Sequence, residues 1–353
     1  MGGTEDKRTT GTRPTSRDVA RLAGVSHTAV SFVFNGRAEG NLSPATQERI
    51  RQAAAQLGYR PDPVARGLRR RRTAVIGLVT DEIASSPFAG RLLRGAMETA
   101  WDREHLVLTV DSGGDPAKED AAVAELLDRR VDGIIYAAMS LRRVRVPEGL
   151  HRTHSVLANC LPEDDSLPAV IPAERAGGRT AARLLLDQGH RRLAHVGGLD
   201  DIASVERLRG FRDTLRAEGI TVPKEWVVRT GGEIAGGYEG ATRLLGGVPA
   251  DRRPTAIFAY NDRVAAGVLH AATRLGIDVP GDLSVVGYDD QEHMAAFLTP
   301  ALTSVALPHR EMGEAAARLL LDAIGTGRTP AATVRRIACP VVSRASVGPA
   351  PTR

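Results

Sequence analysis

The N-terminal part of the fold is decided by residues 15–36, TSRDVARLAGVSHTAVSFVFNG. This stretch predicts two short helices joined by a turn at Gly24, the helix-turn-helix arrangement with which many proteins read DNA. Thr15 can cap the first helix, with Asp18 completing a capping box, and Ser26 can cap the second helix. An ordinary helical hairpin is the alternative, and the segments downstream make it the weaker one.

Apolar residues recur at helical spacing on these two segments and on a third one. They are Val19, Leu22 and Ala23 in the first helix, Val25 after the turn, and Val30, Val33 and Phe34 in the second helix. A third helix begins at Ser43 and Pro44, ends at Gly58, and turns Ile50, Ala53, Ala54 and Leu57 inward. Three helices within about 45 residues predict a small all-α bundle.

Length and composition exclude several classes of protein. The chain has 353 residues, 42% of them hydrophobic and 25% charged, which indicates two or three soluble domains. No run of 18 apolar residues occurs, so we expect no membrane span. Residues 1–14 are polar and lack the apolar core of a secretory signal, which predicts a disordered tail. Cys160 and Cys339 have no metal-ligand spacing around them, so we expect a reduced cytoplasmic protein with neither a disulfide nor a metal.

A linker separates two regimes of composition. We expect the helix-turn-helix domain over residues 15–61 and the linker over 62–73, where Pro61 and Pro63 break the preceding helix. The linker offers one apolar side of a single helical turn, which is too short to be stable alone. It ends in four arginines at 69–72, and basic charge concentrated in the N-terminal part suits a polyanionic partner, although a run of arginines can also be merely solvated.

From residue 74 to 353, apolar strand-like runs alternate with helical segments. The runs are 74–79, 106–110, 133–136, 156–158, 193–196, 256–258 and 284–286, and the helical segments include 91–104, 119–130, 176–188, 205–218 and 264–275. This alternation predicts parallel sheets covered by helices on both faces. About 280 residues exceed one comfortable sheet, so we expect two α/β lobes that face each other across a cleft at the carboxyl ends of their strands.

These residues together resemble the LacI/GalR family of bacterial transcription regulators. The resemblance is carried in the N-terminal part by Asp18-Val19-Ala20, Ala23-Gly24-Val25-Ser26, Val30-Ser31, Asn35-Gly36, Tyr59-Arg60-Pro61 and Val64-Ala65-Arg66-Gly67-Leu68. It continues in Gly189-His190-Arg191-Arg192, Arg207 with Gly210-Phe211, Asn261-Asp262, Val279-Pro280, Ser284-Val285-Val286-Gly287-Tyr288-Asp289-Asp290, and Pro300 with Leu302-Thr303.

The resemblance implies a two-lobed regulatory domain over residues 74–353, similar to periplasmic sugar-binding proteins, with chain crossings near 172, 303 and 335. It further implies a homodimer that binds a palindromic double-stranded DNA operator, most often as a repressor. A small-molecule effector, by the resemblance a sugar or sugar derivative, would control that binding from the cleft between the lobes. The protein would act in the cytoplasm, at the nucleoid.

The recognition helix and the linker supply the expected DNA contacts. Base edges would face the side chains near the start of the second helix, namely His27, Thr28, Ala29 and Phe32, while Thr15, Ser26, Ser31 and Asn35 would bind phosphates. In the linker, the resemblance implies that Leu68 enters a central base step, with Val64 and Ala65 on the same side and Arg66 near a phosphate. Phe32 departs from the family, which usually has arginine there and so can contact guanine.

Five residues correspond to the family's ligand site: Phe88, Asn159, Arg207, Asn261 and Asp289. Polar groups around one aromatic ring suit a sugar, whose hydroxyls need paired donors and acceptors. Two structural alternatives stay open, because Asn261 could cap the next helix and Asp289 could hold a turn. Ala173 stands where many relatives have aspartate, which leaves that corner of the cleft in doubt.

We find no sequence signature of catalysis. A Walker loop, a dinucleotide-binding glycine pattern, a nucleophile elbow and a zinc-protease motif are all missing from the sequence, so we expect neither an enzyme nor a cofactor. Two other functions stay open. One is a regulator whose effector is not a sugar or has been lost, and the other, less favoured, is a small-molecule binding protein of the transport type.

Overall fold

The computed structural model describes residues 14–59, 72–82 and 90–352. The chain divides into two compact units, Met1–Thr73 and Ala74–Arg353. Within the described ranges, no helix is long and apolar enough to cross a membrane. The two units are described separately below.

The first unit is built from three helices, α1 (Ser16–Ala23), α2 (His27–Phe34) and α3 (Pro44–Leu57). The capping box at the start of α1 is confirmed, since the Thr15 backbone N–H donates to the Asp18 carboxylate at 2.9 Å and the Thr15 side chain accepts from the Asp18 N–H. Ser26 Oγ accepts from the Ala29 N–H at 3.2 Å and caps α2. Gly24 ends α1 at φ 62°, a left-handed conformation that glycine adopts without strain. The local sequence therefore sets both helices and the turn.

Apolar side chains from all three helices make the core of this unit. Val19, Val30 and Ile50 are at most 1% exposed, and Ala20, Ala23, Ala53 and Ala54 surround them. Leu22 was expected in this core but is 47% exposed. The buried face of α1 runs through Val19, Ala20 and Ala23, so Leu22 falls at its margin.

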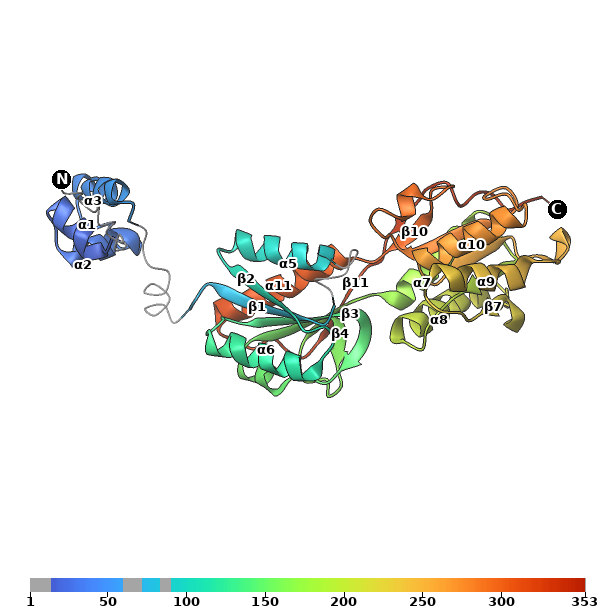
Figure 1. Cartoon of the computed structure of the whole chain (residues 1–353), viewed down its shortest axis with the longest axis horizontal. Helices are drawn as coiled ribbons and strands as arrows, with labels where there is room; N and C mark the ends of the chain where they lie inside the picture. The colour runs from blue at the N-terminus through green and yellow to red at the C-terminus, as the bar shows by residue number, and fades with distance from the viewer. Residues whose placement is uncertain (1–13, 60–71, 83–89, 353) are drawn as a thin grey trace, which may run out of the picture. The chain divides into compact units, whose positions relative to one another are not determined.

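The second unit contains two six-stranded sheets, each at the centre of one lobe (Figure 1). Sheet A has the order β11-β5-β4-β3-β1-β2, and its strands are all parallel. Their bounds are β1 (Val75–Thr80), β2 (Leu106–Asp111), β3 (Ile134–Val144), β4 (Ser155–Pro162), β5 (Ala169–Pro172) and β11 (Val334–Ile337). These strands form the first lobe.

Sheet B has the order β12-β10-β9-β8-β6-β7 and forms the second lobe. Its strands are β6 (Leu193–Val196), β7 (Val227–Val228), β8 (Ala256–Ala259), β9 (Ser284–Asp289), β10 (Thr303–Ala306) and β12 (Val341–Val342). The strands pair in parallel except β12, which runs antiparallel to β10.

Helices cover both faces of each sheet, as the alternating pattern predicts (Figure 1). In the first lobe, α5 (Gly90–Asp102) and α11 (His309–Thr326) pack on one face and α6 (Pro116–Asp128) on the other. In the second lobe, α9 (Ile234–Leu245) and α10 (Asp262–Arg274) cover one face, and α7 (Glu174–Asp187) and α8 (Ile202–Ala217) cover the other. The short 3₁₀ turns are η1 (Glu148–Arg152), η2 (Lys224–Trp226), η3 (Ala250–Arg252) and η4 (Ala295–Phe297).

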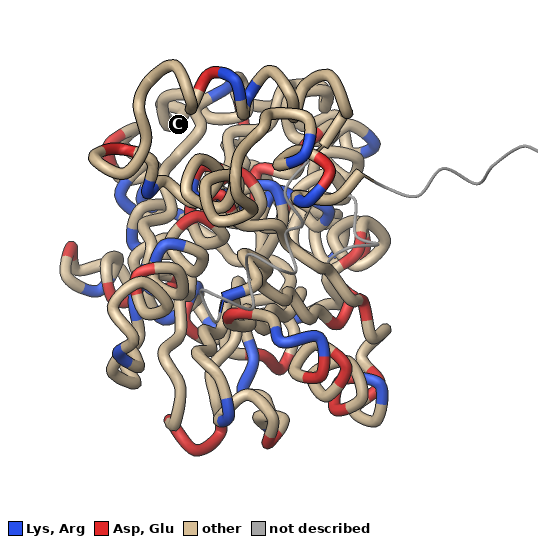
Figure 2. The backbone as a smooth tube through the Cα atoms, turned by 90° about the vertical axis from the view of Figure 1, so that its left-hand side faces the viewer, with Lys and Arg blue, Asp and Glu red and all other residues tan. Residues whose placement is uncertain are grey.

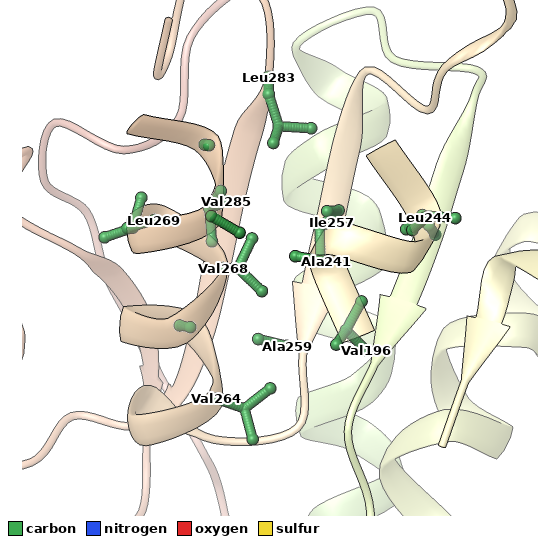
Figure 3. Close-up of a cluster of buried hydrophobic side chains, with 14 of the residues drawn as sticks. Val196, Ala241, Leu244, Ile257, Ala259, Val264, Val268, Leu269, Leu283 and Val285 are labelled. Atoms are coloured by element: carbon green, nitrogen blue, oxygen red, sulfur yellow. The ribbon is translucent and has the colours of Figure 1, made fainter. Parts of the chain in front are cut away.

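The packing of α10 shows how such a face is filled (Figure 3). Val264 and Val268 point from α10 toward Ile257 and Ala259 of β8 and Val285 of β9, and all five are buried. Burying aliphatic side chains of this size contributes about 1.5–3 kcal/mol each relative to exposure. The strands are therefore held by apolar contact on both sides, which leaves their ends free to carry polar groups.

The chain passes between the lobes three times. It leaves β5 at Pro172 and enters α7 at Glu174, it leaves β10 at Ala306 and enters α11 at His309, and residues 338–340 join β11 to β12. The sequence placed these crossings near 172, 303 and 335, so the last two lie a few residues later than expected. Each crossing starts at the carboxyl end of a parallel strand and is only a few residues long. The carboxyl edges of the two sheets consequently face each other.

Candidate nucleic-acid interface and ligand cleft

The start of α2 presents polar side chains to solvent. Ser26, His27 and Thr28 are exposed, whereas Ala29 is 8% exposed and belongs to the core of the three helices. Ala29 therefore departs from the expected reading surface, because the α2 face that packs on α1 and α3 begins with it. Phe32 is half-buried. The exposed part of the expected reading surface therefore consists of His27 and Thr28, with Phe32 partly accessible beside them.

His27 is tied to the first helix. Its Nε2 lies 2.9 Å from the hydroxyl of Ser16, in the first turn of α1. This contact orients the imidazole with respect to α1. Sequence reasoning missed Ser16, although a hydroxyl in the first turn of a helix is a usual DNA-phosphate contact.

The four expected phosphate contacts already have partners within the unit. The Thr15 hydroxyl donates to Asp18 at 2.6 Å, and Asn35 Nδ2 donates to the Ser31 carbonyl at 2.6 Å and to Ser31 Oγ at 2.9 Å. Ser26 Oγ accepts a hydrogen bond as a cap and so keeps its own O–H for a phosphate. The Asn35 amide nitrogen is therefore directed at Ser31, and binding of a phosphate by this amide would compete with that contact. Val64, Ala65, Arg66 and Leu68 lie outside the described residues.

In the second unit, four of the five expected ligand residues lie at or near the carboxyl edges of the sheets, and Phe88 lies outside the described residues. Asn159 belongs to β4 and is 3% exposed, with a left-handed φ of 56°. Its Nδ2 donates to the carbonyls of Ala138 at 2.9 Å and Met139 at 3.0 Å. Register shifts between β3 and β4 at this point, so Asn159 holds the irregular part of β3.

Asp81 directly follows β1 and fixes the same region from the other side. Its carboxylate accepts from the Met139 N–H at 2.9 Å and from Arg142 Nη2 at 3.0 Å. Asp81 is 6% exposed. Sequence reasoning did not select it, although an acid placed directly after a buried strand is a recognisable signal for a site at a sheet edge.

Arg207, on α8, is almost wholly enclosed, with a side chain 4% exposed. Its Nε and Nη2 donate to the two carboxylate oxygens of Glu174 at 2.8 and 2.9 Å, and its Nη1 donates to the Tyr260 carbonyl at 2.9 Å. The guanidinium carbon lies 3.7 Å from the centre of the Tyr288 ring. Burial alone lowers the pKa of Arg207, but the carboxylates of Glu174 and Asp289 raise it well above its usual value. Arg207 is therefore a permanent cation held in a fixed position.

Asp289 is the second carboxylate beside this guanidinium. It ends β9 with φ 102°, and its Oδ1 lies 3.4 Å from Arg207 Nη1 while its Oδ2 accepts from Gln291 Nε2 at 3.2 Å. Burial raises the pKa of Asp289 to about 6, and the charge of Arg207 opposes that rise. Asp289 thus holds the turn after β9, the structural alternative, and also lies in contact with Arg207; its contact with a ligand stays a prediction.

Asn261 caps a helix, which is the structural alternative that the sequence left open for it. It caps α10, with Oδ1 accepting from the Val264 N–H at 2.8 Å and Nδ2 donating to the Gly232 carbonyl at 2.9 Å, and it is 3% exposed. The next residue, Asp262, accepts from Ser304 Oγ at 2.6 Å and from the Gln291 N–H at 2.7 Å. Burial, and then the charge of Asp289, raises the pKa of Asp262 to about 8, so it is mostly protonated at neutral pH.

The lobes touch each other beside this site. Arg91 Nε of α5 lies 3.2 Å from Glu292 Oε2 of the second lobe, and Ile202 of α8 packs against the apolar cluster of the first lobe. A small pocket between the lobes is lined by Arg91, His309 and residues 289–292. Asp81 and Asn159 lie together at the edge of the first lobe, where both bind Met139, and Arg207, Asn261 and Asp289 lie at the edge of the second lobe. We call these two groups together the inter-lobe site. Among the described residues, no group of three or more His, Cys, Asp or Glu side chains could hold a metal ion.

Each of the two units matches a known protein family. The description "Bacterial regulatory proteins, lacI family" matches residues 15–62, and "Periplasmic binding protein-like domain" matches residues 182–347. The ribose operon repressor of Escherichia coli (strain K12) is 31% identical over 313 residues, covering 88% of this chain and 93% of that protein.

Two solved structures extend the likeness to the fold. The lac repressor dimer bound to operator and the anti-inducer ONPF superposes with a TM-score of 0.76 at 25% identity, covering 96% of this chain and all of that one. The complex of the transcriptional regulator CelR with cellobiose superposes with a TM-score of 0.65 at 30% identity, covering 95% of this chain and all of that one.

Proposed function

The chain belongs to the lacI family of bacterial regulatory proteins. We propose that it is a sequence-specific transcription regulator that acts as a repressor, and that a small molecule controls its binding to the operator. The observation that carries this proposal is the start of α2. Two capped helices, joined at a left-handed Gly24, expose His27 and Thr28 at the end of the helix that enters the major groove in this class of protein.

The effector binds in the inter-lobe site. Support comes from the facing carboxyl edges of two parallel sheets, which is where open α/β sheets bind ligands, and from the likeness to a regulator solved with cellobiose. A sugar or sugar derivative is the first candidate. A ligand that bridges the lobes binds one arrangement of the lobes more tightly than another. This difference in affinity would shift the protein between a state that binds the operator and one that does not.

One observation favours a second candidate for the effector. Ala173 offers no polar side chain at the first crossing between the lobes. A regulator whose effector is not a sugar, or that has lost its effector, is consistent with this fact. A thermal-shift series over sugars, phosphosugars and purines separates the candidates, because a ligand at 100 times its Kd adds about 2.7 kcal/mol to the stability of the folded state.

The functional protein is a homodimer that binds palindromic DNA in the cytoplasm. Support comes from the likeness to a repressor solved as a dimer on its operator and from apolar side chains exposed on the first lobe. Met97 and Trp101 of α5 are 45% and 72% exposed, and Leu106 and Leu108 of β2 are 57% and 42% exposed. A patch of this kind on a protein surface marks an interface, and a two-fold dimer presents two reading helices to two half-sites.

Selection of DNA from a randomised pool by the full-length protein, at a stated salt concentration, tests the proposal. We expect enrichment of a palindrome. Enrichment of no sequence, both with and without candidate effectors, would contradict the role of a specific regulator.

A further inference from the structure

Glu174 and Arg207 form a buried ion pair next to the first crossing between the lobes. Glu174 begins α7 two residues after β5 ends, and Arg207 lies on α8. The side chains are 3% and 4% exposed, and two parallel N–H···O bonds of 2.8 and 2.9 Å join them. A bidentate pair of this kind is the strongest arrangement available to a guanidinium and a carboxylate. A carboxylate or phosphate of a ligand would bind the guanidinium through the same two N–H groups. Glu174 already occupies both of these donors.

The charge around Arg207 is negative rather than positive. Asp289 adds a second carboxylate 3.4 Å from Nη1, and it is largely ionised at neutral pH because its pKa is about 6. One guanidinium therefore faces two carboxylates. An anion approaching this corner would meet net repulsion, and binding Arg207 would require displacing Glu174 and leaving a buried carboxylate without its partner.

Other arginines near the inter-lobe site are neutralised in the same way. Each has a carboxylate within 3.2 Å, in the pairs Arg91–Glu292, Arg142–Asp81, Arg263–Glu233 and Arg344–Asp290. Acidic and basic residues are likewise intermingled over the backbone (Figure 2). The site is thus rich in carboxylate oxygens, which accept hydrogen bonds, and its guanidinium groups are already paired.

We propose that Glu174 determines the class of effector: by holding Arg207 it makes the inter-lobe site accept an uncharged, hydroxyl-rich molecule and reject carboxylates and phosphates. Hydroxyl groups donate to carboxylates without bringing in a charge. This inference rests on the proposed function, because it assumes that the inter-lobe site binds the effector.

Phosphate binding by the full-length protein tests the proposal, with inorganic phosphate as the probe. Thermal unfolding is followed against phosphate at constant ionic strength, with saturating heparin present to occupy the arginine-rich first unit. The variants are Glu174→Gln, which removes the charge and one of the two acceptor oxygens facing Arg207, and Glu125→Gln on α6, which removes the same charge from an exposed pair with Arg129. A double variant, Glu174→Gln with Arg207→Gln, assigns any gain to Arg207.

We expect wild type and Glu125→Gln to show no saturable response to phosphate. Glu174→Gln should gain a saturable rise in Tm of about 3 °C or more at about 20 mM phosphate, and the double variant should lose it. A folded Glu174→Gln variant without this gain would overturn the proposal. So would a saturable phosphate response in the wild type, which decides the question even if Glu174→Gln does not fold. The DNA selection described above measures operator binding and involves no phosphate titration, so failure of the proposed regulator is distinguished from failure of this inference.

Discussion

The hydroxyl of Ser16 lies 2.9 Å from Nε2 of His27 and joins the first turn of α1 to the first turn of α2. A side chain that we expect to read a base is thereby positioned by a residue that has no need to touch a base. Ser16→Ala should keep the fold, because one partly exposed hydrogen bond contributes only about 1 kcal/mol. We expect weaker binding to the selected operator and unchanged binding to scrambled DNA, measured by fluorescence anisotropy at one salt concentration. An equal loss on both DNAs would show instead that Ser16 acts as a phosphate contact.

Phe32 predicts an operator that differs from the usual half-site of the family at one base pair. A half-buried phenyl ring has no donor for guanine O6 and N7, and the helix that carries it contains no charged residue. Phe32→Arg should introduce a preference for guanine at one base pair of each half-site, amounting to about 1–3 kcal/mol. The measurement is a DNA selection with wild type and variant in parallel, and Arg37, exposed and beyond α2, supplies the control Arg37→Ala. An unchanged consensus would remove Phe32 from the reading surface.

Leu68 stays a prediction of the sequence, because it lies outside the described residues. A leucine that enters a base step costs unstacking energy and bends the duplex, which brings more of the protein against DNA. Leu68→Ala should therefore lower affinity for the operator and spare affinity for non-specific DNA. Leu22→Ala, an exposed apolar change in the first unit, is the control. Parallel loss on operator and non-specific DNA in titrations at fixed salt would refute this role.

His195 makes the second lobe sensitive to acid. Its ring packs beside those of Phe211 and Phe258, with centroid distances of 6.4 and 5.1 Å, and burial lowers the pKa of His195 to about 4. Between pH 6.5 and 4 the unfolded chain takes up a proton at this histidine and the folded chain does not, so stability falls as the pH falls through that window. At pH 4 this proton uptake has lowered the free energy of unfolding by about 3 kcal/mol.

The variant His195→Phe isolates this effect from other titrating groups. Its unfolding free energy relative to wild type should rise by about 3 kcal/mol from pH 7 to pH 4, in urea melts at each pH. Leu193→Ala, in the same strand, removes a buried side chain that does not titrate and should cost a constant amount. If His195→Phe shows the same constant difference, the histidine is not held neutral in the folded state.

Local signals in the sequence account for much of the structure. The caps Thr15, Ser26 and Ser43 and the left-handed Gly24 each act within a few residues, so the helices of the first unit follow from the chain itself. Long apolar runs likewise mark the central strands of both sheets. The strands β5, β7, β10, β11 and β12 were not among the expected runs; they lie toward the sides of the two sheets, whereas β6 and β8, also of four residues, carry the apolar runs of a sheet centre.

The inter-lobe site was harder to predict because it depends on contacts between distant residues. Placing Arg207 near Asp289 followed from the resemblance, but nothing in the sequence shows that Glu174, 33 residues away, takes both prongs of the guanidinium. Asn261 shows the opposite case: its position before a helix made a cap a natural alternative, and the structure has that cap. Ala29 was placed on the reading surface because helical spacing alone does not show where a three-helix core ends.

The exposed apolar patch of the first lobe gives the proposed dimer a direct test. β2 is an edge strand of sheet A, α5 packs beside it, and together they expose Met97, Trp101, Leu106 and Leu108. Charges placed in the middle of an apolar interface must lose their hydration without gaining partners. The double variant Trp101→Glu, Leu106→Lys should therefore be monomeric in light scattering after size exclusion, at a concentration where the wild type is dimeric.

Ile234→Lys, an exposed apolar position on α9 of the second lobe, should leave the dimer intact. The monomeric variant should also bind a half-site as well as it binds the palindrome, since two reading heads would no longer be joined. A double variant that remains dimeric would move the interface away from α5 and β2.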